Sequence, residues 1–489
     1  MTRSTHDGSA GSRRTPASAT ASNSRAAVAA SPGDPGRANR NNAIANALAL
    51  CDTRVRRSGT PRIHRSESEM NGENRTARGA LVAAVVLTLS ACGGSGGEDE
   101  HEHTHLDTAG RLALLRDASP TVAIYDLDSK AVAKTFDMAN APSGIYSSPD
   151  RRYALALQRE QNLVQIIDGG IWQEDHVDHL HDYKQEPQQL GFTISGSMPT
   201  HYETHDSLTA IFMDGLGSAG QKAGVRVISE ASLGKGALEA SLDLPIDMHG
   251  TAEPRGDYLL TTYRAAGTAD TLPSQVELYR RNGATYDFVT RFTEACPALH
   301  GSYSNDSHTV FGCGDGVLVV TQQGEAFSAK KIANPPGLPA GVRIGTIAGH
   351  HERENFVGIA SPGHLFEIDP AAGTMTSITW ADGRTRRAHT FDAEGENFLV
   401  LDDLGVAHVM DAARSFAIRS AIPTVSSMPA AAPFPAMAAS GADDKVYVTD
   451  PAARSIAVVD LERLQIAERL PLDFSPTGIT WLGIGHHAH

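Results

Sequence analysis

The stretch Tyr153 to Asp168, YALALQREQNLVQIID, is the clearest copy of a unit that recurs along the chain: an apolar strand, a polar turn, and a second strand that ends in an acid. Further copies are Phe356 to Asp369, FVGIASPGHLFEID, and Val446 to Asp460, VYVTDPAARSIAVVD. From Arg111 onward, short runs of β-forming residues alternate with turn residues, and almost no segment has the apolar period of a helix. The repeats predict an all-β fold built from copies of one unit.

The number of units follows from the expected innermost strands, whose intervals of about 40 to 57 residues match a four-stranded propeller blade. Residues Pro476 to Ile484 form a lone inner strand, whereas Leu112 to Phe136 supply three strands without one. We therefore predict a β-propeller over residues 110–489, closed by pairing of its N- and C-terminal strands. Eight blades are favoured, and seven is the alternative. The inner strands are expected to begin near Gly144, His201, His249, His300, His350, His389, Met437 and Gly478.

Residues 70–92 have the features of a lipoprotein signal peptide. A basic region is followed by an apolar run from Ala80 to Leu89, which at about ten residues is too short to span a bilayer as a helix. The run ends in Leu89-Ser90-Ala91-Cys92, the pattern of a lipobox. We expect Cys92 to carry lipid and to anchor the protein on the outer face of the cytoplasmic membrane, or the chain to be exported to the periplasm.

The composition of residues 1–69 and the net charge of the chain limit the kinds of partner that the protein can bind. Residues 1–69 are rich in Ser, Ala and Arg without an apolar period, which indicates a disordered extension or a misplaced translation start. The net charge of −15 therefore belongs to an acidic body, which argues against nucleic-acid binding. We expect a monomer.

The expected export of the chain also indicates a role for each of the four cysteines. Cys51 precedes the expected start at Met70, and Cys92 would be lipidated, which leaves Cys296 and Cys313 as a pair on adjacent predicted strands. In an oxidising compartment we expect these two to form a disulfide, with a zinc thiolate site as the alternative.

Histidines recur at one position of the unit, at the expected start of the innermost strand. In a propeller this strand faces the central channel, so equal offsets in successive blades place side chains on one ring around the axis. Imidazole is a common zinc ligand, and converging blades can supply several without local sequence spacing. The alternative role is a polar lining bonded to water or backbone. The candidates are His201, His249, His300 and His389, with a weaker case for His350 because His351 could take its place.

A second group of histidines lies in Glu174 to Asp182, EDHVDHLHD, where we expect a long loop. Three imidazoles within six residues can fold around one ion, and the interleaved acids can orient the ligand rings. Calcium prefers an all-oxygen shell, so zinc is the expected ion. A solvated polar loop is the alternative. We favour this loop over the channel ring as the principal zinc site, with His176, Asp178, His179 and His181 as its ligands.

A third group lies in the expected flexible linker over residues 93–109. There Glu98 to His105, EDEHEHTH, follows the glycine-rich tether after Cys92. A run of this kind binds zinc or copper loosely because no rigid frame fixes the ligand geometry. We expect His101, His103 and His105 to capture zinc and to bring it to a buried site.

These three histidine groups together resemble the AztD-type periplasmic zinc metallochaperones, which are β-propeller proteins. The resemblance covers most of the exported body, and the loop from Glu174 to His181 is its most specific part. It implies zinc binding without catalysis, and transfer of zinc to the solute-binding protein of a zinc ABC transporter. The lipobox is a departure from a freely diffusing chaperone.

Two other functions compete with zinc transfer. A metal-dependent propeller hydrolase of the lactonase kind would use channel histidines to activate water, which requires an open coordination position and a nearby general base. A lipid-anchored propeller scaffold would need neither. The chain has no recognisable nucleophile elbow, phosphate loop or dinucleotide fingerprint.

Overall fold

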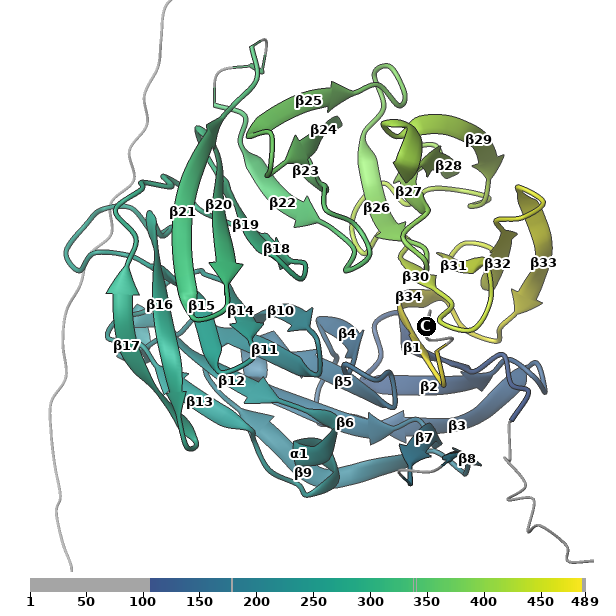
Figure 1. Cartoon of the computed structure of the whole chain (residues 1–489). Helices are drawn as coiled ribbons and strands as arrows, with labels where there is room; N and C mark the ends of the chain where they lie inside the picture. Colours follow the sequence, from purple (N-terminus) through teal and green to yellow (C-terminus); the bar gives the residue numbers. More distant parts are fainter. Residues whose placement is uncertain (1–105, 177–178, 337, 340, 486–489) are drawn as a thin grey trace, which may run out of the picture. The chain divides into compact units, whose positions relative to one another are not determined.

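The computed structural model describes residues 106–176, 179–336, 338–339 and 341–485, and these form an eight-bladed β-propeller (Figure 1). Each blade is an antiparallel four-stranded sheet, as predicted from the repeats. The innermost strands surround the centre of the ring in Figure 1, and neighbouring ones such as β10 and β14 contact one another. Within the described residues no helix is both long and apolar enough to cross a membrane.

The blades share one layout from the channel outward. The innermost strands are β4 (Gly144–Ser147), β10 (Pro199–His205), β14 (Ala252–Arg255), β18 (Ser302–Ser304), β22 (Ile344–Ala348), β26 (Arg386–Phe391), β30 (Met437–Ala439) and β34 (Pro476–Leu482). The second strands are β1 (Arg111–Arg116), β5 (Tyr153–Gln158), β11 (Leu208–Met213), β15 (Tyr258–Tyr263), β19 (His308–Cys313), β23 (Phe356–Ala360), β27 (Asn397–Asp402) and β31 (Lys445–Asp450). The third strands are β2 (Thr121–Asp126), β6 (Leu163–Asp168), β12 (Gly224–Ile228), β16 (Gln275–Asn282), β20 (Gly316–Gln323), β24 (His364–Asp369), β28 (Val406–Asp411) and β32 (Ser455–Asp460). The outer strands are β3 (Ala131–Asp137), β9 (Gln188–Ser195), β13 (Ala240–Asp243), β17 (Thr285–Arg291), β21 (Ala326–Ala333), β25 (Thr374–Ile378), β29 (Ala417–Pro423) and β33 (Gln465–Pro471).

The repeated unit forms the second and third strands of a blade. In the copy from Tyr153 to Asp168, the polar residues between β5 and β6 make a 3-10 turn, and Asn162 closes it in the left-handed region at φ +60°. Asparagine is one of the residues that tolerate this conformation. The strands bury their apolar side chains between blades: Leu155 and Ile166 pack with Ile211 of the next blade, and all three are fully buried. Each such burial contributes about 1.5–3 kcal/mol.

The ring closes through the two ends of the propeller, as predicted. The last strand, β34, pairs antiparallel with β1, with Leu112 opposite Trp481 and Leu114 opposite Ile479. This pairing makes β34 the innermost strand of a blade whose other strands come from the start of the propeller. Closure therefore leaves no blade with an unpaired inner strand.

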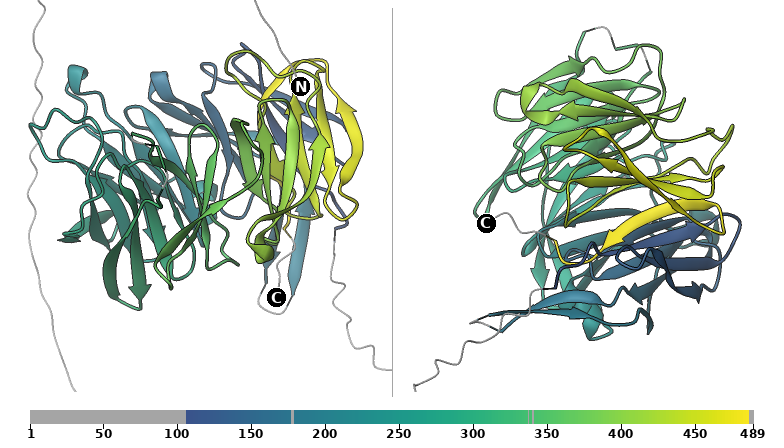
Figure 2. Two further views of the ribbon diagram at one scale, coloured as in Figure 1. Left: turned by 90° about the horizontal axis from the view of Figure 1, so that it is seen from above. Right: turned by 90° about the vertical axis from the view of Figure 1, so that its right-hand side faces the viewer.

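Two expectations need correction in detail. The segment from Glu174 to Asp182 is not a long irregular loop, because its two arms pair as the hairpin of β7 (Ile171–Asp175) and β8 (Leu180–Lys184). The hairpin is inserted between β6 and β9 and projects from the face of the ring on which the described chain ends (Figure 2). The innermost strand expected near His350 ends before it, at Ala348.

The predicted disulfide is present: Cys296 and Cys313 are joined, and both are fully buried. Cys313 ends β19, but Cys296 lies in the connection that follows β17 rather than on a strand. The only α-helix among the described residues, α1 (Glu230–Gly234), is a single turn between β12 and β13.

Candidate metal centre

Three of the histidines predicted to line the channel converge on one point. His201 lies in β10, whereas His249 and His300 lie just before β14 and β18, so three successive blades each supply one imidazole. The Nε2 atom of His249 is 3.4 Å from Nε2 of His201 and 2.9 Å from Nε2 of His300. Two nitrogens bound tetrahedrally to one zinc ion at 2.0–2.1 Å would be separated by about 3.3 Å. The three imidazoles are thus close to the spacing of a zinc ligand set.

The hydrogen bonds of the outer ring nitrogens decide where the protons lie. Nδ1 of His249 is 2.8 Å from Oδ2 of Asp214, and Nδ1 of His300 is 2.7 Å from the Gly345 carbonyl oxygen. Both partners are acceptors, so each Nδ1 carries the proton and donates it. In the neutral rings each Nε2 presents a lone pair toward the other, so the 2.9 Å separation is favourable only with a proton or a metal ion between the two nitrogens. The three imidazoles could hold one metal ion, with the Asp214 carboxylate orienting one of the rings.

Asp214, which sequence reasoning did not identify, fixes the orientation of His249. It follows β11 directly and is 5% exposed, and its Oδ2 also accepts a hydrogen bond of 2.8 Å from Arg159. It lies 35 residues from His249 in sequence. Its position in the repeat could have identified it, because it is an acid directly after the second strand of one blade and lies beside the inner strand of the next.

Glycine follows two of the three ligands and allows their close approach. A Cβ atom on Gly250 would lie 2.1 Å from Oγ1 of Thr262, and one on Gly301 would lie 3.0 Å from the Gly345 carbonyl oxygen. Only glycine fits at Gly250 without a shift of its neighbours. The His-Gly pairs in the sequence are therefore part of the geometry that brings the imidazoles together.

Burial keeps the imidazoles ready to bind metal. The pKa of His201 is lowered to about 4 by burial and by the neighbouring His249, and the pKa of His300 is lowered to about 4 by burial and by His201. Both rings are therefore neutral at pH 7, the form that coordinates metal. Burial has the opposite effect on Glu203, whose pKa rises to about 8 and whose Oε1 is 3.7 Å from Nδ1 of His201.

The other two ring candidates do not join this group. His389 lies in β26, where its Nδ1 is 3.1 Å from the Arg386 guanidinium and its ring packs near Phe398. His350 lies beyond the end of β22, with Nε2 2.9 Å from the Ala393 carbonyl oxygen and its ring beside His351.

The β7–β8 hairpin brings its own histidines together at its tip. The ring centroids of His176 and His181 are 5.0 Å apart, and those of His179 and His181 are 4.5 Å apart. The base of the hairpin is held by Trp172, which stacks on Tyr183 and lies under the Arg152 guanidinium. Asp178, the fourth proposed ligand, lies outside the described residues, as do His101, His103, His105 and Cys92.

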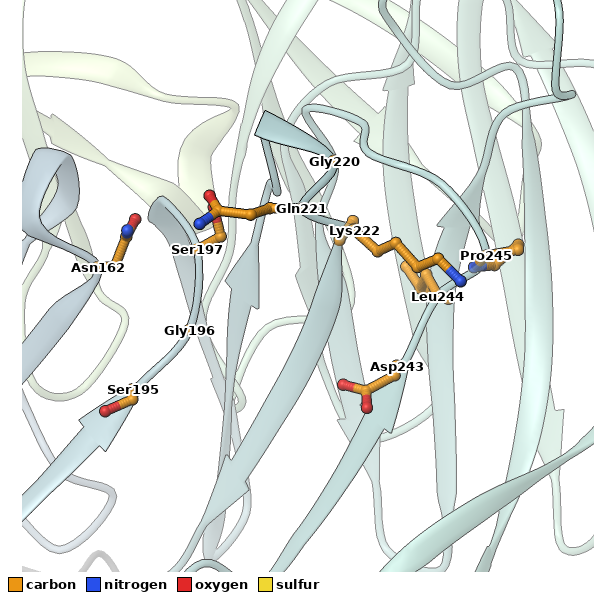
Figure 3. Close-up of a pocket in the computed structure, with 11 residues that line it drawn as sticks. Asn162, Ser195, Gly196, Ser197, Gly220, Gln221, Lys222, Asp243, Leu244 and Pro245 are labelled. Carbon is orange, nitrogen blue, oxygen red and sulfur yellow. The ribbon is translucent and has the colours of Figure 1, made fainter. Parts of the chain in front are cut away.

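One groove in the described structure carries no metal-binding chemistry. It has a volume of about 720 Å³ and lies between neighbouring blades, where Asn162, Ser197, Lys222 and Asp243 line it (Figure 3). No imidazole or thiol is among its lining residues, and Asp243 is its single carboxylate.

Comparisons with known proteins bear on the same chemistry. No family model matches the chain. The zinc chaperone AztD of Citrobacter koseri is 25% identical over 415 residues, which cover 83% of this chain and 93% of that protein. The crystal structure of Citrobacter koseri AztD matches with a TM-score of 0.67 at 21% identity, over 78% of this chain and 99% of that one. The dihydro-heme d1 dehydrogenase NirN in complex with DHE matches with a TM-score of 0.53 at 13% identity, over 77% of this chain and 75% of that one. At these identities the structural matches show the propeller fold alone.

Proposed function

We propose, from the premise that this chain is a homologue of the zinc chaperone AztD, that it binds zinc in the cell envelope and transfers it to the solute-binding protein of a zinc ABC transporter. The observation that supports zinc as the cargo is the convergence of the three Nε2 atoms of His201, His249 and His300. The lowered pKa values of His201 and His300 leave these two imidazoles neutral at pH 7, so protons compete little with zinc for their nitrogens.

Transfer requires a site that a second protein can reach. Three protein ligands leave a fourth tetrahedral position for water or for an incoming ligand. The side chain of His249 is 32% exposed and that of His201 is 18% exposed, so the site is partly open to solvent. A ligand of the partner can therefore bind zinc before the imidazoles release it, and zinc never has to leave as the free ion.

The hairpin and the linker histidines are proposed to capture zinc first. The backbone N–H of Leu106 donates a hydrogen bond of 2.8 Å to Oδ2 of Asp182, in the middle of β8. This contact fixes the beginning of the propeller beside the hairpin, and His105 is the next residue toward the N-terminus. We propose that the run of His101, His103 and His105, which precedes Leu106 in the sequence, captures zinc together with His176, His179 and His181.

The direct test of transfer uses zinc-loaded protein and its candidate solute-binding partner. The two are mixed, separated, and analysed for zinc by mass spectrometry over time. We expect zinc to reach the partner faster than it reaches a chelator of equal affinity, because ligand exchange avoids free zinc. Equal rates to partner and chelator would show that the partner only scavenges released zinc, and would overturn the transfer proposal.

A zinc-dependent hydrolase is the second candidate, favoured by one observation. Glu203 lies 3.7 Å from His201 and its pKa is raised to about 8, as in a carboxyl that serves as a general base or acid. Zinc-loaded protein would then hydrolyse lactone or phosphoester substrates, and Glu203→Gln would abolish turnover. Absence of turnover in zinc-loaded protein that still transfers zinc would exclude this alternative for those substrates.

A further inference from the structure

A cavity of about 1150 Å³ connects the hairpin with the channel. Its lining includes Gln173 and Glu174 of the hairpin, Glu203 and His205 of β10, and Gly485 at the end of the described chain. Many of the lining side chains are carboxylates, among them Asp206, Asp306, Glu352 and Glu394. The cavity therefore presents a negative potential to cations on the face that carries the hairpin.

Strand β10 joins this cavity to the histidine triad. Glu203 and His205 are two residues apart on one strand, so they share a face and are separated by about 7 Å. Glu203 lines the cavity, and its Oε1 is also 3.7 Å from Nδ1 of His201. A cation bound near His205 would thus meet the Glu203 carboxyl before it reached the triad.

The far end of β10 carries a second set of ligand atoms. One ligand atom each from His205, Asp206 and Asp306 lie within 4.8 Å of one another. His205 is 8% exposed, and its Nδ1 has no hydrogen-bond partner among the described residues. Oδ2 of Asp206 lies 3.1 Å from this nitrogen but outside hydrogen-bond geometry. Nδ1 of His205 is thus a buried polar atom without a hydrogen bond, and it faces a carboxylate oxygen. A cation bound between the two atoms would give both of them a partner.

Arg255 holds this set in place without pairing with its carboxylates. Its guanidinium donates to the Asn305 carbonyl oxygen, to the Asp306 carbonyl oxygen at 2.6 Å, and through Nε to Gln322 at 2.8 Å. These bonds fix the turn that presents Asp306. The positive charge also lies close to the set, with NH1 3.0 Å from Nε2 of His205, so a cation would bind here more weakly than at the triad.

We propose that His205, Asp206 and Asp306 form an uptake site for divalent zinc, from which Glu203 passes the ion to the triad of His201, His249 and His300. This inference rests on the proposed function, because it needs the triad to be the zinc-holding site. A weak, partly exposed site beside a stronger one speeds loading without holding the cargo. One histidine with two carboxylates suits a first-row divalent ion that keeps several waters.

The test measures loading of the full-length apo protein with cobalt(II), which replaces zinc and absorbs visible light when bound by the triad. Stopped-flow absorbance gives the loading rate, and the endpoint gives the amount bound. We expect Asp206→Asn/Asp306→Asn to reach the wild-type endpoint with a rate reduced at least about tenfold, as expected for loss of a steering charge pair at low salt. Glu203→Gln is also expected to slow loading, because it replaces a carboxyl oxygen on the path from the uptake site to the triad.

The matched control removes the same charge from the same cavity. In Glu352→Gln/Glu394→Gln both substituted residues line the cavity, but neither belongs to the proposed site. We expect this variant to load at close to the wild-type rate. A loading rate that is unchanged in Asp206→Asn/Asp306→Asn, or that falls equally in both double variants, would overturn the uptake site.

A second measurement does not depend on the loading rate, so it still tests the uptake site if a variant of the first experiment misfolds. It also distinguishes failure of this inference from failure of the proposed function. Equilibrium dialysis against zinc compares His300→Ala with His300→Ala/Asp306→Asn, and the uptake site predicts less bound zinc in the latter. Equal zinc contents would contradict it. If His300→Ala does not alter the cobalt spectrum of the otherwise unchanged protein, the triad is not the holding site, and the proposed function fails with the inference that rests on it.

Discussion

At the scale of single residues, Asp214 accepts the hydrogen bond that orients the His249 ring within the triad of His201, His249 and His300. Asp214→Asn keeps the volume but weakens the acceptor for Nδ1–H of His249. We expect zinc affinity at the triad to fall about 10- to 100-fold, the usual cost of removing a carboxylate behind a histidine ligand. Competition with a chromophoric chelator measures the affinity. Asp473→Asn, at an exposed position with no ligand role, is the control and should bind zinc as the wild type does.

The depressed pKa values of His201 and His300 predict how the protein responds to acid. An unfolded imidazole protonates near pH 6.5, whereas these two remain neutral until the pH approaches about 4. The unfolded apo chain therefore binds more protons than the folded one between pH 6.5 and 4, so the free energy of unfolding falls as the pH is lowered through this window. The loss for the pair is on the order of a few kcal/mol.

Thermal unfolding of the apo protein at pH 7 and at pH 5 checks this prediction. We expect a lower melting temperature at pH 5, and a smaller drop between the two pH values in His201→Ala/His300→Ala. An equal drop in this variant and in the wild type would assign the acid sensitivity to other groups.

The ligand residues could be predicted from sequence only in part. Register along the repeat placed His201, His249 and His300 on the channel side, and the structure brings them together. The same register included His389 and His350, but an arginine partner holds the first, and the second lies past the end of its strand. Register specifies the side of the blade on which a residue lies, whereas convergence depends on strand length and on the neighbouring side chains.

At the scale of elements, the β7–β8 hairpin is a separate two-stranded sheet inserted in one blade. Because it adds no strand to the blade, its tip can change without disturbing the core. We expect His176→Ala/His179→Ala/His181→Ala to lower zinc content while leaving the melting temperature of the apo protein within about 2 °C, since surface substitutions rarely cost more than 0.5 kcal/mol.

Metal analysis after dialysis against limiting zinc gives the zinc content of this variant. His364→Ala, a substitution at an exposed histidine of β24, is the control. Unchanged zinc content in the triple variant would place all tightly bound zinc in the channel and would remove the hairpin from the capture step.

The disulfide between Cys296 and Cys313 ties the connection after β17 to the end of β19. It closes a loop of sequence separation 17. Closure of a loop of this size lowers the entropy of the unfolded chain and contributes about 3 kcal/mol. We expect Cys296→Ser/Cys313→Ser to lose about this amount in urea unfolding, and dithiothreitol to destabilise the wild type but not the variant. Equal sensitivity of both to the reductant would mean that the bond does not form.

At the scale of the whole molecule, blade length and the unequal ends of the repeat array predicted ring closure and favoured eight blades over seven, and the structure has eight. The alternation of strands and turns extends over many residues, so a few ambiguous positions do not change the fold that it predicts. The hairpin escaped prediction because its strands are short and polar, and only their pairing with each other distinguishes them from a loop. The hydrogen bonds that orient the imidazoles of the candidate metal centre likewise depend on contacts between blades, which no local pattern encodes.

Closure of the ring depends on a single strand, β34, and Trp481 is its principal anchor. Trp481 is 2% exposed, faces Leu112 across the β1–β34 pairing, and donates its indole N–H to the Ala109 carbonyl oxygen at 3.0 Å. It packs in one apolar cluster with Tyr447 and Ile456 of the preceding blade, so the same ring holds the closing blade to its neighbour. Trp481→Ala removes all of these contacts at once.

We expect Trp481→Ala to lower the free energy of unfolding by about 3–5 kcal/mol, the usual cost of truncating a buried aromatic side chain. Loosening β34 also exposes the edge of β1, so the variant should aggregate on heating at temperatures where the wild type remains soluble. Chemical denaturation measures the first effect, and light scattering during a thermal ramp measures the second. Trp172→Ala is the control, because Trp172 contacts the hairpin and Arg152 at its base and takes no part in the β1–β34 pairing, so its loss should leave global stability nearly unchanged. If both tryptophan variants were equally stable, pairing of β34 with β1 would not be what holds the ring closed.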